Sequence, residues 1–111
     1  MSECLFCRIV SRELPAQLVH EDELSVAFKD IAPKAPVHVL VVPKKHLARL
    51  SDSSDGDAVL LGHLQRVAAR IAAQYKLESF RVVTNNGRGV GQTVDHLHYH
   101  VVGGGSIKSF D

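Results

Sequence analysis

The segment that decides the fold, residues 96–102, reads His96-Leu97-His98-Tyr99-His100-Val101-Val102. Three histidines recur in it at a spacing of two residues. Side chains at i, i+2 and i+4 of a β-strand point to the same face of the sheet. The apolar residues between the histidines would then pack on the opposite face. The sequence therefore predicts a strand, over residues 92–102, that carries a row of three imidazoles.

Three interpretations of the histidine row are open. The row is either a set of surface imidazoles on an edge strand, one metal site shared by all three, or a catalytic group. A strand rises about 3.3 Å per residue, so His96 and His100 would lie roughly 13 Å apart and could share a metal only after strong distortion. Imidazole is a good nucleophile towards phosphorus near neutral pH. The pattern therefore favours catalysis, with one imidazole attacking and the others positioning the substrate.

Composition limits the classes of protein that this chain can belong to. Its 111 residues, 45% of them hydrophobic and 23% charged, are typical of one soluble domain, here expected over 1–111. A formal net charge of +1 gives no electrostatic reason to expect nucleic acid or an anionic membrane as a partner. No apolar run is long enough to span a bilayer, and the N-terminus carries no secretory signal pattern. We expect a cytoplasmic protein.

The order of the expected elements favours an α+β fold. The clearest helix has an apolar stripe with a spacing of three or four residues, formed by Leu60, Leu64, Val67, Ala68, Ile71 and Tyr75. The predicted elements are a short helix or turn at 4–10, strands at 17–20, 24–30, 37–42, 80–84 and 92–102, and a helix at 57–75. They predict a five-stranded antiparallel meander sheet packed on one main helix.

Residues 96–102 fit the His-φ-His-φ-His-φ-φ motif of the histidine-triad superfamily, whose members bind and cleave nucleotides. The segments 27–38, 41–46, 81–85 and 91–94 resemble the Hint branch, the nucleoside phosphoramidases. The resemblance extends from about Cys7 to Gly104. It implies a histidine-triad-like fold and a homodimer formed through the helix and its neighbouring strand. It also implies hydrolysis of purine nucleoside phosphoramidates, such as those of AMP, with no cofactor needed for the chemistry.

The resemblance also implies a role for each residue of the catalytic group. His98 is similar to the family's nucleophile, which forms a nucleotidyl-histidine intermediate. His100 would contact the phosphate, and His38 would complete the imidazole group. Thr93 would donate its hydroxyl to the phosphate or the leaving group, at a position where Hint-type proteins more often carry serine.

The nucleotide itself would be bound by residues from several segments. By resemblance, Asp30 accepts the ribose hydroxyls and Asn85 contacts phosphate or ribose. The walls of the base pocket would be Phe28, Ile31 and Leu40. The phosphate turn would be Gly91, Gln92 and Thr93. From the residues alone, plain core packing is an equal interpretation for the apolar residues, and capping of a turn is one for Asp30.

The only two cysteines form the motif Cys4-Leu5-Phe6-Cys7. Such a pair can bind zinc, act as a redox couple or have no special role. A thioredoxin-like motif follows a strand, and nothing before Cys4 could supply one. Resemblance to bacterial histidine-triad proteins with this pair implies a structural zinc on Cys4, Cys7, His46 and His96. His20 and His63 match no family site, and we expect ordinary surface roles for both.

Two other functions remain open at this point. One is a dinucleoside polyphosphate hydrolase, from another branch of the superfamily. The other is a zinc-stabilised nucleotide-binding scaffold with little turnover. The segment 43–46 and the pair Gly103-Gly104 favour the Hint branch. Tails of the family reach towards the partner's active site and influence the choice of substrate, whereas the short tail expected here, residues 106–111, leaves the choice of amine open.

Overall fold

The computed structural model describes residues 4–105, so the prediction for the tail lies outside the described residues. The helices are α1 (Leu5–Val10) and α2 (Ala58–Gln74). The strands are β1 (Leu18–Glu21), β2 (Ser25–Lys29), β3 (Val37–Pro43), β4 (Phe80–Val83) and β5 (Tyr99–Gly103). Short 3₁₀ turns occupy Leu50–Asp52, Asp55–Asp57 and Arg88–Val90. Except at β5, every predicted helix and strand begins and ends within one residue of its observed limits.

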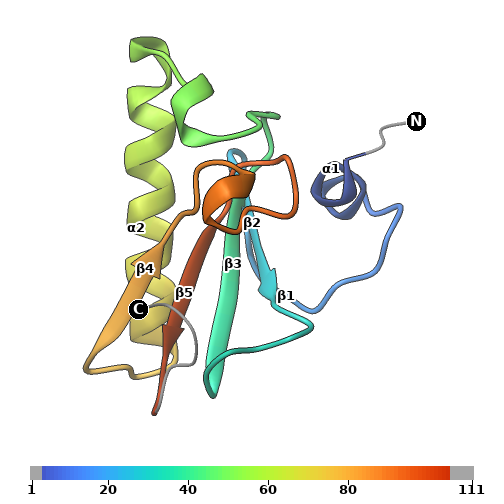
Figure 1. The fold of residues 1–111 in the computed structure, drawn as a ribbon. Helices are drawn as coiled ribbons and strands as arrows, with labels where there is room; N and C mark the ends of the chain where they lie inside the picture. The colour runs from blue at the N-terminus through green and yellow to red at the C-terminus, as the bar shows by residue number, and fades with distance from the viewer. Residues whose placement is uncertain (1–3, 106–111) are drawn as a thin grey trace.

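The five strands form one antiparallel sheet in the order β1-β2-β3-β5-β4, and α2 lies along one face of it (Figure 1). The predicted fold class, a five-stranded antiparallel sheet packed on one main helix, is confirmed. The predicted meander holds only for the first three strands, because β5 inserts between β3 and β4. The histidine strand is therefore central, with hydrogen-bonded neighbours on both sides.

Both faces of the sheet are covered by apolar side chains. The α2 face buries Leu64, Val67 and Ile71 of the predicted stripe against strand residues such as Val41 and Val101. The opposite face carries a second cluster, closed at one end by α1: Phe6, Ile9, Val26, Phe28, Leu40 and Val42. This two-sided burial explains why β3 is apolar almost throughout. Among residues 4–105, neither helix combines the length and the apolar character needed to cross a membrane.

The predicted start of the histidine strand is wrong. The strand was expected over 92–102, but β5 begins at Tyr99 and ends at Gly103. Tyr99 pairs with Val41, so a longer strand would next have to pair with Val42 and then with Pro43. Proline has no backbone N–H to donate to a ladder. The carbonyl of Pro43 lies instead 2.8 Å from Nε2 of His96. His96 and His98 therefore precede the strand.

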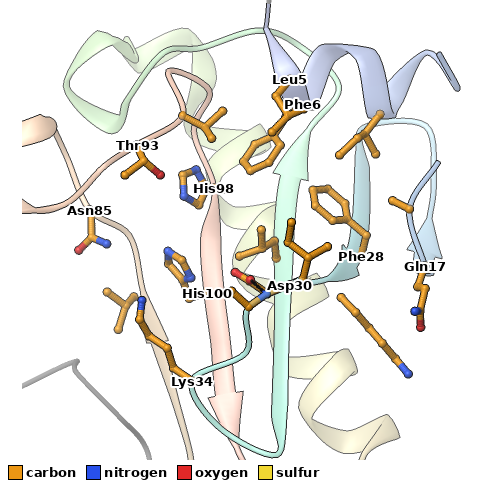
Figure 2. A pocket seen from close by; sticks show the side chains of 18 of the residues that line it. Leu5, Phe6, Gln17, Phe28, Asp30, Lys34, Asn85, Thr93, His98 and His100 are labelled. Carbon is orange, nitrogen blue, oxygen red and sulfur yellow. Dashed lines mark hydrogen bonds between the residues drawn. The ribbon is translucent and has the colours of Figure 1, made fainter. Parts of the chain in front are cut away.

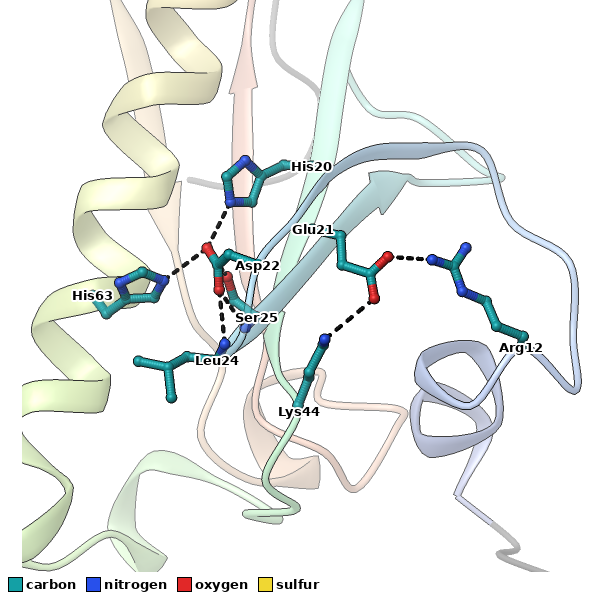
Figure 3. Close-up of polar contacts among 8 residues, drawn as sticks. All are labelled: Arg12, His20, Glu21, Asp22, Leu24, Ser25, Lys44 and His63. Carbon is teal, nitrogen blue, oxygen red and sulfur yellow. Dashed lines mark hydrogen bonds and ion pairs between the residues drawn. The ribbon is translucent and has the colours of Figure 1, made fainter.

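The two histidines without a predicted site share one carboxylate (Figure 3). Oδ2 of Asp22, in the β1–β2 turn, lies 2.6 Å from Nε2 of His20 and 2.8 Å from Nε2 of His63 on α2. Oδ1 accepts the backbone N–H groups of Leu24 and Ser25, each at 2.8 Å. Burial by itself raises the pKa of Asp22, but these hydrogen bonds outweigh burial and hold it well below its usual range. The cluster ties the edge of the sheet to the helix.

A second ion-pair group lies beside it. Glu21, the last residue of β1, pairs with Arg12 and, at 3.2 Å, with Lys44 (Figure 3). Arg12 follows α1, and Lys44 follows β3. The group therefore links the segment after α1 to the sheet, although its partly exposed charges contribute only modestly to stability.

Candidate active site and metal centre

A cavity of about 920 Å³ opens on the side of the sheet away from α2 (Figure 2). Leu5, Phe6 and Ile9 of α1 cover one end of it. Nine of the residues predicted to bind nucleotide line it: Phe28, Asp30, Ile31, Leu40, Asn85, Gly91, Thr93, His98 and His100. Ile31 is fully exposed, whereas Phe28 and Leu40 are buried. The structure thus brings together side chains that come from five separate segments of the sequence.

His98 is held in one tautomer by the backbone. Its Nδ1 lies 2.7 Å from the carbonyl oxygen of His96, which can only accept a hydrogen bond. Nδ1 therefore carries the proton, and Nε2 keeps a lone pair. The ring is 6% exposed and meets the edge of Phe6 at a centroid distance of 5.1 Å. Burial lowers the pKa of His98, against the opposing effect of the backbone hydrogen bond, so the ring is neutral at pH 7.

His100 is held in the opposite tautomer by a chain of hydrogen bonds. The backbone N–H of Lys34 donates to Nδ1 of His38 at 3.0 Å. Nε2 of neutral His38 must then carry the proton, and it lies 2.8 Å from Nδ1 of His100. His100 consequently carries its own proton on Nε2. Burial, reinforced by His98 and His38, lowers the pKa of His100 to about 4. The cavity therefore contains a neutral donor, His100, next to a neutral imidazole, His98, whose Nε2 carries a lone pair.

His38 itself does not line the cavity. It is 4% exposed and lies behind His100, with Nε2 also 3.5 Å from Oδ2 of Asp30. Burial lowers the pKa of His38, although the charge of Asp30 opposes that shift. The predicted imidazole group thus consists of two rings at the cavity and one ring that orients them from behind.

Gln92 also lies outside the cavity lining. Its side-chain nitrogen donates to the carbonyls of Ala48 at 2.7 Å and Val94 at 3.0 Å, and its oxygen accepts the N–H of Gly87 at 2.8 Å. These bonds close the loop that presents Asn85 and Thr93 to the cavity (Figure 2). Gly91 has φ of +99°, a conformation that L side chains rarely adopt. The side chain of Gln92 therefore holds the shape of the turn that is predicted to bind phosphate.

Cys4, Cys7, His46 and His96 bring their ligand atoms within 4.8 Å of one another. Nδ1 of His96 lies 3.3 Å from Sγ of Cys4, 3.4 Å from Sγ of Cys7 and 3.2 Å from Nδ1 of His46. A tetrahedral zinc site with ordinary Zn–S and Zn–N bonds has edges of about 3.3–3.8 Å. Because the carbonyl of Pro43 fixes the proton of His96 on Nε2, Nδ1 is left as a metal-ligating lone pair. The donor set and its spacing fit a zinc ion.

Comparison with known proteins agrees with this geometry. Residues 11–107 match the family model of the HIT domain. The chain belongs to the HIT-domain family. HIT-like proteins of Synechocystis sp. and Synechococcus elongatus are 52% identical over 103 residues and 50% identical over 109 residues. The alignments cover 92% of this HIT protein and 90% of the first relative, and 96% of both chains for the second.

Solved structures extend the comparison to the fold. A HIT family hydrolase from Legionella pneumophila superimposes with a TM-score of 0.92 at 42% identity, covering 94% of this HIT protein and 95% of that chain. A histidine triad protein from Clostridium difficile gives a TM-score of 0.93 at 39% identity, covering 100% and 98% of the two chains. At these identities the likeness concerns the family as well as the fold.

Several cavity residues of this HIT protein were not predicted from its sequence. They include the α1 residues Leu5, Phe6 and Ile9, together with Lys34 in the β2–β3 connection. The cysteine motif predicts metal binding, whereas Leu5 and Phe6, the two residues between the cysteines, point into the cavity (Figure 2). Lys34 lies inside the matched segment 27–38, but a single lysine gives no pattern from which a role could be inferred.

Proposed function

We propose that the protein hydrolyses purine nucleoside 5′-phosphoramidates through a nucleotidyl-histidine intermediate. The observation that carries the proposal is the orientation of His98, whose unprotonated Nε2 belongs to a ring that lines the cavity. A solved relative, from Legionella pneumophila, is described as a HIT family hydrolase. Membership of the Hint branch is part of the proposal.

The proposed reaction has two displacements at phosphorus. First, the lone pair on Nε2 of His98 forms an N–P bond, the bond from phosphorus to the amine breaks, and the amine leaves with one added proton. A water oxygen then attacks the same phosphorus, the N–P bond to His98 breaks, and the water gives up one proton, which replaces the proton taken by the amine. The products are a nucleoside monophosphate and regenerated His98, and the two steps together consume one water molecule.

Different cavity residues would bind the phosphate, the ribose and the base of the substrate. The proton on Nε2 of His100 is available to a phosphate oxygen, as are the hydroxyl of Thr93 and the amide of Asn85, which face the same end of the cavity (Figure 2). Asp30 supplies a carboxylate for the ribose hydroxyls. The apolar end, which includes Phe28 and Leu40, suits a purine base.

Zinc and dimerisation complete the proposal. A zinc ion held by Cys4, Cys7, His46 and His96 would fasten α1 to the segment before β5 and take no part in the chemistry. A homodimer would form through α2 and β4, because β4 is one of the two outer strands of the sheet and its Phe80 is 43% exposed. Light scattering on the purified protein tests the dimer, and elemental analysis tests the zinc.

The proposed activity is tested with three substrates: adenosine 5′-monophosphoramidate, diadenosine triphosphate and diadenosine tetraphosphate. We expect the phosphoramidate to give the highest kcat/KM, and His98→Ala to remove turnover. Preference for either polyphosphate would assign the protein to the other branch of the superfamily. Binding of AMP without any turnover that depends on His98 would make it a nucleotide-binding scaffold.

A further inference from the structure

Lys34 brings a positive charge to the cavity at the end where the catalytic imidazoles lie. We propose that Lys34 determines leaving-group specificity, and that its ammonium group selects phosphoramidates whose amine carries a carboxylate, such as an amino acid joined through its nitrogen. The inference rests on the proposed phosphoramidase function and specifies its substrate class. It concerns a side chain that the proposed bond-breaking steps do not use.

The position of Lys34 is fixed by its own backbone. Its N–H donates to Nδ1 of His38, and His38 in turn bonds to His100. The Lys34 side chain is half-buried and lines the cavity. In Figure 2 the Lys34 side chain extends from the β2–β3 connection towards His100, and Asn85 lies on the opposite side of this end of the cavity. The backbone that carries the ammonium group is therefore held at a fixed position relative to His38 and His100 by these hydrogen bonds.

The charges around the cavity are unevenly distributed. Three charged side chains line it in the described range 4–105, namely Lys29, Asp30 and Lys34, and the histidines are neutral. The N–H of Lys29 donates to the carbonyl of Gln17, and Figure 2 places Gln17 across the cavity from Asn85. Of the two lysines, Lys34 is thus the one whose backbone lies at the end of the cavity that holds the imidazoles.

The charge of Lys34 reaches the reacting groups. After burial, which is the largest cause, the positive charge of Lys34 also contributes to lowering the pKa of His38 and of His100. The same positive charge would attract an anion placed between His100 and Asn85.

The leaving group occupies this side of the cavity in an in-line displacement. The amine departs from the face of phosphorus opposite the attacking His98. In Figure 2, Lys34 lies on the far side of His100 from His98. The phosphate oxygens already have neutral donors in His100, Thr93 and Asn85. The ammonium group of Lys34 is therefore placed to pair with a carboxylate on the departing amine.

The test compares two phosphoramidates of adenosine that differ in one charge. The glycine derivative carries a carboxylate, and the glycinamide derivative carries a neutral amide of nearly the same size. We expect the wild-type protein to favour the glycine derivative by about tenfold in kcat/KM, because only this derivative can form an ion pair with Lys34. In Lys34→Gln the ratio should approach one, and Lys34→Arg should retain the preference.

A charge-matched control separates local from general electrostatics. Lys76 is exposed beyond the end of α2 and has φ of 56°, which asparagine tolerates. Lys76→Asn removes the same charge and should leave the glycine-to-glycinamide ratio at its wild-type value. An unchanged ratio in Lys34→Gln would overturn the inference. An equal loss on both substrates would also overturn it, since Lys34 would then act on the transferred phosphate.

A binding measurement distinguishes failure of this inference from failure of the proposed function. Dissociation constants of both derivatives are measured by calorimetry in His98→Ala, with and without Lys34→Gln. If the wild-type protein hydrolyses neither derivative, the proposed function fails, and the ratio of dissociation constants still decides the role of Lys34. We expect tighter binding of the glycine derivative only where Lys34 is present, and equal affinities with Lys34 present would refute it.

Discussion

His96 and His98 lie two residues apart, and their rings use opposite nitrogens. Both are buried, and each bonds to one backbone carbonyl. His96 uses Nε2 on Pro43, which leaves Nδ1 facing the thiols of Cys4 and Cys7. His98 uses Nδ1 on His96, which leaves Nε2 as the unprotonated nitrogen of a ring that lines the cavity. The choice of carbonyl therefore decides which ring suits metal binding and which suits nucleophilic attack.

The two sites are also connected. The residue whose ring joins the cysteine cluster provides the carbonyl that sets the tautomer of His98. Phe6, between the two cysteines in the sequence, packs against the His98 ring. Substitutions in the cysteine cluster and among the cavity histidines therefore test whether the proposed metal site and the proposed catalytic group perform separate tasks.

The largest effect is expected from His98→Ala. Removing the only nucleophile of the proposed reaction should lower phosphoramidate turnover by at least about a thousandfold. Zinc content and the circular dichroism spectrum should stay at wild-type values, because His98 is not a ligand of the cysteine cluster. Single-turnover kinetics and elemental analysis on the same preparation check both points. Residual turnover within tenfold of wild type would mean that another group attacks phosphorus.

A smaller effect is expected from His38→Ala, which removes the acceptor of the Lys34 N–H and the donor to His100. The tautomer of His100 is then no longer fixed, and kcat should fall by about 10- to 100-fold, the usual cost of losing an orienting partner. His38→Gln, which can both accept and donate, should recover part of the loss. Equal activity of the alanine and glutamine variants would contradict an orienting role for His38.

The metal side of the comparison is tested by Cys7→Ser. This variant should lose most of its bound zinc, and its melting temperature should fall by roughly 5–10 °C. Turnover at 25 °C should change by less than tenfold, since the metal is proposed to be structural. Adding zinc should raise the melting temperature of the stripped wild-type protein and leave that of the variant unchanged. A loss of turnover as large as that of His98→Ala would place the metal in the chemistry.

The smallest effect is expected from Asp22→Asn, in the cluster that Asp22 forms with His20 and His63. Loss of the charge that binds His20 and His63 should lower the free energy of unfolding by about 2 kcal/mol at pH 7. The folded-state pKa of Asp22 lies below its unfolded value, so this stabilisation is present above about pH 4 and disappears as the pH falls further. Urea unfolding at several pH values measures it. A difference from wild type that does not shrink below pH 4 would assign the effect to packing.

The fold could be predicted from the sequence because its signals are periodic. The α2 stripe and the β-branched run of β3 report the two faces of the sheet directly. The start of β5 could not be predicted, because it depends on Pro43, a residue more than fifty positions earlier that faces the strand only after folding. The alternation of His96, His98 and His100 therefore predicted three side chains on one face of a strand. In the structure His96 and His98 lie before the strand begins.

The candidate site was predictable only as far as the family motif reaches. The cavity residues Asp30, Asn85 and Thr93 follow from segments that resemble the family. The covering helix α1 and the structural role of the Gln92 side chain do not, because a six-residue helix and a buried amide have no distinctive pattern in the sequence. Lys34 shows the same limit, since its importance depends on where a connection between strands places its charge.

The division of the histidine row is tested most directly by trapping the intermediate in the zinc-loaded protein. The protein is mixed with an adenosine 5′-phosphoramidate, quenched within milliseconds at a pH where phosphohistidine survives, and mapped by peptide mass spectrometry. The account predicts one adenylyl group on His98, with zinc still bound in a parallel unquenched sample. An adenylyl group on His96 or His100, or multiple turnovers with no labelled histidine, would contradict it.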